Sequence, residues 1–249
     1  MTIPTSVFLS LTLNVGTAPA ERTDFGALLV VYDHSVTANR QDGPYTSLAE
    51  AEAAGFTSTA EPALHLALQK AFTPSNGVES VVVGRKDAGD ADWTATLTAV
   101  FADDPTSFYF VIIESRADAD IQDAYNYVSS YTPGKYLIVQ SDDLTMTECL
   151  LAQAATIDRV AFVYDASDAV ALDASIASRG GGKNLDSIDG QSGWGYMSAS
   201  GASPATLTSA EGAAIVAAGA NYYVRVGGKS FYYPGKSASG LETRAQVSL

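Results

Sequence analysis

VESVVVGR (78–85), SFYFVIIES (107–115), KYLIVQSD (135–142) and RVAFVYD (159–165) are the four apolar runs that decide the fold. Each run suits a β-strand that is buried on both faces, because apolar residues occupy consecutive positions. The segments between the runs have the apolar spacing of helices: DWTATLTAVFADD (92–104), DADIQDAYNYVSSY (118–131) and TECLLAQAATI (147–157). Strands that alternate with helices are typical of a parallel sheet covered on both faces. We therefore predict an α/β fold with a mostly parallel sheet.

The chain before residue 78 adds one strand and two helices to this prediction. FGALLVVYD (25–33) is a further continuous apolar run. In YTSLAEAEAAGF (45–56), Ser47 is a suitable N-cap and Glu50 completes a capping box three residues later. Pro62 is a favourable first residue for the second helix.

The chain after residue 165 breaks the alternation. Residues 180–193 are rich in glycine and serine, and we expect an exposed, mobile loop there. LTSAEGAAIVAAG (207–219) has helical spacing. Two short strands within 222–233, joined at Gly227-Gly228, predict a C-terminal β-hairpin.

The first residues of the chain predict an extended strand arm. SVFLSLTLNV (6–15) alternates strictly, which demands one buried face. Such a terminal strand pairs either within its own domain or with another chain. The apolar face consists of Val7, Leu9, Leu11, Leu13 and Val15.

The net charge and the hydrophobic content of the chain limit the kinds of partner that it can bind. The chain has 249 residues, 47% of them hydrophobic, and a formal net charge of −14. This charge disfavours nucleic acid and anionic membranes as partners. The chain contains no apolar run of membrane-spanning length and no recognisable signal peptide, so we expect a soluble protein made in a cytoplasm.

Two copies of the tripeptide GKS, which ends the nucleotide-binding P-loop signature, lie in the C-terminal region. The signature requires a glycine five positions before the glycine that precedes lysine, but Tyr223 and Ser230 stand there. Both copies therefore belong to turns, and we expect no bound nucleotide.

Candidate catalytic and metal-binding residues are few. His34 and His65 are the only histidines, and Cys149, the only cysteine, lies in a helical pattern that suggests a buried thiol. Two acidic pairs, Asp118 with Asp120 and Asp142 with Asp143, are able to hold a hard cation but also suit helix N-termini. We prefer the helix-terminal role, and we expect no catalytic, cofactor-binding or metal site and no enzyme activity.

Several separated stretches of the chain form one ordered set of motifs. The first half contributes Thr46, Ser47, Phe56, Val81, Val82, Val83 and Arg85. The second half contributes Gly201, Pro204, Leu207, Thr208, Gly219, Asn221, Tyr222, Gly235 and Gly240. In their order and spacing, these positions resemble the contractile tail sheath proteins of myophage-like viruses, and the resemblance extends over nearly the whole chain.

The resemblance implies a structural subunit of a phage tail, found in the virion and assembled in the host cytoplasm. Its partners would be further copies of itself, the tail tube protein, and the baseplate and tail terminator proteins. It divides the chain into an arm (1–20), a first part of the core domain (21–78) and an α/β domain (79–249). Family members usually continue into a further C-terminal domain, so we expect either an unusually small subunit or a fragment.

Two other functions stay open at this point. One is another tail or baseplate structural protein. The other is a ligand-binding α/β domain whose site the sequence motifs do not reveal.

Overall fold

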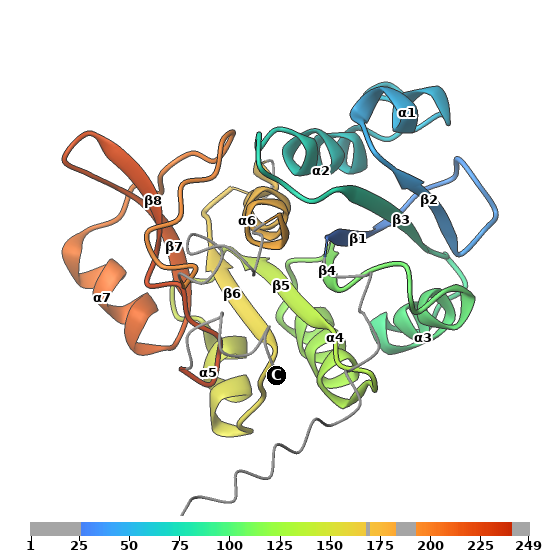
Figure 1. The fold of residues 1–249 in the computed structure, drawn as a ribbon. Helices are drawn as coiled ribbons and strands as arrows, with labels where there is room; N and C mark the ends of the chain where they lie inside the picture. Colours follow the sequence, from blue (N-terminus) through green and yellow to red (C-terminus); the bar gives the residue numbers. More distant parts are fainter. Residues whose placement is uncertain (1–25, 168–169, 183–192, 241–249) are drawn as a thin grey trace, which may run out of the picture.

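The computed structural model describes residues 26–167, 170–182 and 193–240, in which eight strands form one sheet between two layers of helices (Figure 1). The order of the strands across the sheet is β2-β3-β1-β4-β5-β6-β7-β8. The strands are β1 (Ala27–Asp33), β2 (Gln41–Tyr45), β3 (Ser80–Lys86), β4 (Phe110–Ile113), β5 (Tyr136–Ser141), β6 (Val160–Tyr164), β7 (Asn221–Val226) and β8 (Lys229–Tyr233).

The sheet is mostly parallel, as the sequence predicts. The six strands from β3 to β7 in this order run parallel to one another, and the two outermost strands, β2 and β8, are antiparallel to their neighbours. β1 lies between β3 and β4, so the chain winds outward from β1 in both directions. In a sheet of this kind, the carboxyl ends of β1 and β4 form the topological switch point.

Helices cover both faces of the sheet (Figure 1). Leu28 and Val30 of β1 belong to a core shared with α1, α2 and α6, whereas Leu29 and Val31 belong to a core shared with α3, α4, α5 and α7. Burial of both faces explains why the strands are continuous apolar runs. The helices are α1 (Leu48–Ala53), α2 (Pro62–Phe72), α3 (Trp93–Asp103), α4 (Asp118–Ser130), α5 (Thr147–Ala154), α6 (Leu172–Gly181) and α7 (Ser209–Ala217).

The predicted helix starts are confirmed. The Ser47 hydroxyl accepts a hydrogen bond from the N–H of Glu50 and caps α1, and Pro62 is the first residue of α2. The predicted capping box is only half formed, because the Glu50 carboxylate accepts from the N–H of Thr46 instead of that of Ser47. Thr208 and Glu211 form a reciprocal capping box at the start of α7. These contacts satisfy N–H groups that have no partner within the helix.

The sequence did not predict β2 or α6. β2 (QDGPY) contains Gly43 and Pro44, which weaken a strand pattern, and its pairing with β3 is irregular. α6 continues through Gly180 and Gly181, so the predicted loop at 180–193 begins too early. Gly180 is buried against the indole ring of Trp194, which leaves no room for a larger side chain. The rest of the predicted loop, residues 183–192, lies outside the described residues.

The predicted arm also lies outside the described residues, including Val7, Leu9, Leu11, Leu13 and Val15. Within the three described ranges, no helix combines the length and the apolar character that crossing a membrane requires.

Candidate functional site

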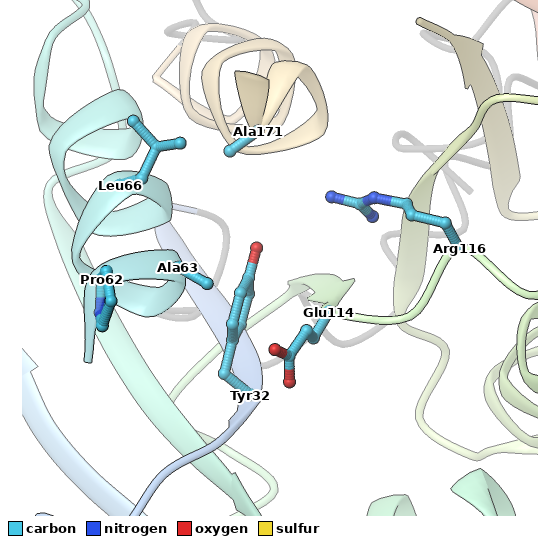
Figure 2. Close-up of a pocket in the computed structure, with 7 residues that line it drawn as sticks. All are labelled: Tyr32, Pro62, Ala63, Leu66, Glu114, Arg116 and Ala171. Atoms are coloured by element: carbon cyan, nitrogen blue, oxygen red, sulfur yellow. The ribbon is translucent and has the colours of Figure 1, made fainter. Parts of the chain in front are cut away.

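A pocket of about 510 Å³ lies at the topological switch point of the sheet. Figure 2 shows Tyr32 of β1 pointing between α2 and Arg116, with Glu114, the residue after β4, beside it. Ligands of doubly wound folds bind at this position in the sheet. The full lining is Tyr32, Pro62, Ala63, Leu66, Glu114, Arg116 and Ala171.

The polar groups of this pocket are engaged with the protein itself. Arg116 donates to the carboxylate of Asp173 at 2.8 Å and to the carbonyl of Ile113 at 3.0 Å. Glu114 accepts a hydrogen bond from the N–H of Asp33 at 2.9 Å. Burial, with Asp173 nearby, raises the pKa of Tyr32 well above its usual range, so its hydroxyl stays protonated. The lining forms a concave surface with one neutral phenol, that of Tyr32, but it contains no activated nucleophile.

The histidines and the cysteine occupy separate sites. His34 is buried against Phe56, neither ring nitrogen has a hydrogen-bond partner, and burial lowers its pKa. His65, on α2, contacts the Glu52 carboxylate at 2.8 Å. Cys149 lies in the core on the opposite face of the sheet, where burial raises the pKa of its thiol to about 12. These three residues form no catalytic arrangement.

Three carboxylates come together at the carboxyl edge of the sheet. Asp118 is the first residue of α4, Asp143 lies between β5 and α5, and Glu148 is the second residue of α5. One oxygen from each lies within 4.8 Å of the other two. The sequence placed Asp118 and Asp143 in two separate pairs, and it did not suggest Glu148.

Glu148 is the unusual member of this group. Its side chain is fully buried, and neither carboxylate oxygen has a hydrogen-bond partner. Burial raises its pKa, and the charges of Asp118 and Asp143 raise it further. The Ser141 hydroxyl offsets part of this rise without reaching hydrogen-bond geometry. The two aspartates, by contrast, are exposed and half-buried.

The β7–β8 hairpin projects beyond the rest of the sheet (Figure 1). β6 pairs with β7 only at Asn221 and Tyr222, so Val224–Val226 pair with β8 alone among the described strands. Gly227 and Gly228 form the predicted turn, with φ of +58° and +81°. Gly228 belongs to the first GKS tripeptide, which is therefore a turn and not a phosphate-binding loop.

One face of this hairpin is apolar and partly exposed, apart from Lys229, which pairs with Val226 at the tip. Tyr196 packs its ring against Phe231 and Tyr233, and 69% of Tyr196 is exposed. Val226, near the tip, is 59% exposed. We call Tyr196, Val224, Val226, Phe231 and Tyr233 the hairpin face. Exposed apolar side chains that gather in this way often mark an interaction surface.

The outer edge of β8 is partly covered. Tyr232 exchanges backbone hydrogen bonds of 2.8 Å with Tyr196 and Met197. This contact fixes the segment that carries Tyr196 against the hairpin. Nearer the tip, the carbonyl of Ser230 accepts a hydrogen bond of 3.2 Å from the Tyr223 hydroxyl.

No family model and no protein of curated function matches the sequence. Among solved structures, the fold is similar to the helical sheath of the anti-feeding prophage (AFP) in its contracted state, determined by electron cryomicroscopy. The TM-score is 0.54 at 12% sequence identity, and the match covers 90% of this chain and 68% of that chain. The two chains therefore share a sheath-like α/β fold.

Proposed function

We propose that this protein is a structural, non-enzymatic subunit of a contractile phage tail sheath. It polymerises in helical rings around the tail tube and contracts to drive the tube through the host envelope. The observation that carries this proposal is the fold match to a contracted sheath over 90% of the chain. The order of the sequence motifs supports it independently. The tube, baseplate and terminator proteins are the partners that this role requires.

The subunit acts mechanically. The extended lattice is metastable, and its interfaces rearrange into a shorter, wider and more stable lattice. The described domain suits this role because its sheet is packed on both faces. A close-packed interior transmits force and moves as a rigid body.

The N-terminal arm connects neighbouring subunits in this proposal. Residues 6–15 add a strand to the projecting hairpin of a neighbour, since the tip of this hairpin pairs with no other described strand. The alternating apolar residues of the arm then lie beside the partly exposed apolar side chains of the hairpin face and pack against their edge. Backbone hydrogen bonds then hold the subunits together while the domains change their relative orientation.

Removal of the arm tests this connection. Deletion of residues 1–15 should leave a folded domain but abolish polymers in sedimentation assays. Leu9→Asp with Leu13→Asp should do the same, whereas Ser10→Asp, on the opposite face of the arm, should have a smaller effect. Unfolding of the deleted monomer, or polymers that form without the arm, would place the strand within its own domain.

The switch-point pocket favours a second candidate function, a ligand-binding α/β domain. Its volume of about 510 Å³ lies in the range of small-molecule sites. A ligand that binds only the native state raises the melting temperature, so a thermal-shift screen with nucleotides and small metabolites tests this candidate. A ligand whose effect disappears in Leu66→Trp, which fills the pocket, would support it.

Another tail or baseplate protein is the third candidate, because it could share the fold. The number of copies in purified particles separates it from a sheath subunit. A sheath subunit should be among the most abundant proteins of the particle.

A further inference from the structure

The three clustered carboxylates belong to two neighbouring loops. β4 and β5 are adjacent parallel strands, and the helix after each one begins at the same edge of the sheet. Asp118 comes from the first loop, and Asp143 and Glu148 come from the second. The fold thus brings together residues that are 30 positions apart in sequence, Asp118 and Glu148.

Ordinary structural roles account for the two aspartates. Asp143 accepts hydrogen bonds from the N–H groups of Thr145 and Thr147, at 2.8 and 3.1 Å. These contacts stabilise the start of α5. Asp118 is exposed at the first position of α4, where a negative charge favours the helix dipole. Neither residue alone indicates a ligand.

The same roles do not account for Glu148. A fully buried carboxylate with no hydrogen-bond partner is strongly unfavourable, and here it also lies beside two further carboxylates. The N–H of Glu148 at the start of α5 offsets part of this cost, but neither carboxylate oxygen makes a hydrogen bond of normal geometry. A positive ion between the three side chains would supply the missing partner.

We propose that Asp118, Asp143 and Glu148 bind a divalent cation, and that Ca²⁺ suits the site better than Mg²⁺. Oxygen is the only donor type in the group, which favours a hard cation. Ca²⁺ is commonly held by several protein carboxylates in a flexible shell, whereas Mg²⁺ keeps several waters and binds through one or two carboxylates. Three convergent carboxylates therefore favour the larger ion.

The neighbouring thiol does not contribute to this site. The Sγ of Cys149 lies 3.2 Å from the carbonyl of Ala218, within the core. Water completes the coordination shell on the side of Asp118, which is exposed. The bound ion joins the start of α4 to the start of α5 and thereby stabilises this edge of the sheet. This inference does not depend on the proposed sheath role.

Terbium luminescence tests the site directly, with Tb³⁺ as a probe for Ca²⁺. Burial raises the pKa of Tyr125 of α4, and the nearby charge of Glu148 raises it further, so this ring is placed to sensitise Tb³⁺. We expect saturable emission that Ca²⁺ displaces more effectively than Mg²⁺. Tyr125→Phe should reduce the emission without changing the Kd.

Three variants make the test specific. Glu148→Gln and Asp118→Asn should each weaken binding at least tenfold, whereas Asp142→Asn, an exposed neighbour outside the cluster, should leave the Kd unchanged. Circular dichroism establishes that each variant is folded, and the exposed Asp118 provides a second test if Glu148→Gln does not fold. Absence of saturable emission, or equal weakening by Asp142→Asn, would overturn the proposal. Displacement by Mg²⁺ as effective as that by Ca²⁺ would overturn the assignment of the ion.

Discussion

Arg116 donates a 2.8 Å hydrogen bond to Asp173, and this ion pair joins the loop after β4 to the first turn of α6. The Asp173 side chain is fully buried, and the Arg116 side chain is 10% exposed. Each charge therefore depends on the other for solvation. Arg116 also lines the switch-point pocket, and its guanidinium extends toward Tyr32 and Ala171 (Figure 2).

Arg116→Met should destabilise the protein by about 3–5 kcal/mol, because it leaves the Asp173 carboxylate buried without its partner. Urea unfolding measures this loss. Arg116→Met with Asp173→Asn should recover part of it, since no buried charge remains. A loss below about 1 kcal/mol in the single variant would show that water solvates Asp173.

Gly180→Ala should destabilise the protein by about 1–3 kcal/mol, because the added methyl group overlaps the indole ring of Trp194. Gly89→Ala is the matched control. Gly89 is exposed, and a methyl group there makes only an ordinary contact with Asp87. Equal urea midpoints for the two variants would show that α6 is less closely packed than described.

His34 should make the protein less stable as the pH falls below about 6.5. Burial lowers the pKa of His34 in the folded protein below its ordinary value of 6.5, and Arg85 adds to this, whereas Glu61, Asp42 and Asp33 oppose it. Between the two pKa values the unfolded chain binds a proton that the folded protein does not, so stability rises with pH in that window.

His34→Phe removes this titration and tests the prediction. As the pH is lowered from 7 to 5, the free energy of unfolding of the wild type should fall relative to that of the variant, as measured by urea unfolding. His65→Gln, which replaces the other histidine of the chain, is the control. A difference that stays constant with pH would mean that His34 does not carry the effect.

The parallel core was predictable from the sequence because a buried strand leaves a direct signal in its own residues. Val81–Val83 and Val160–Val163 are apolar at nearly every position, as burial on both faces requires. α6 left no such signal. Its buried surface is largely Ala, Ser and Gly, because close packing against α2 and the sheet requires small residues. In the sequence, the same composition resembles that of a loop.

The carboxylate cluster was not predictable for a different reason. Asp118, Asp143 and Glu148 meet only because β4 and β5 are adjacent, and strand order is not encoded in local patterns. Within its own segment, Glu148 resembles an ordinary acidic residue of a first helical turn. The pocket was not predictable for the same reason, because Tyr32, Glu114 and Ala171 come from three segments that are far apart in the sequence.

Val226→Asp should prevent assembly without unfolding the subunit. The side chain is 59% exposed on the hairpin face, so a charge costs little in the monomer but is unfavourable in an apolar interface. Thr59→Asp introduces the same charge in an exposed turn before α2 and should assemble normally. Sedimentation velocity distinguishes monomer from polymer. Normal polymers of Val226→Asp would exclude the hairpin face from the interface.

Electron microscopy of the concentrated, purified protein tests the sheath assignment most directly. A sheath subunit should form rods or tubes with a regular axial striation, since helical stacking is its function. The wild-type chain should form such tubes, and deletion of residues 1–15 should abolish them. Wild-type protein that stays monodisperse, or that forms only closed rings of fixed size at any concentration, would contradict it.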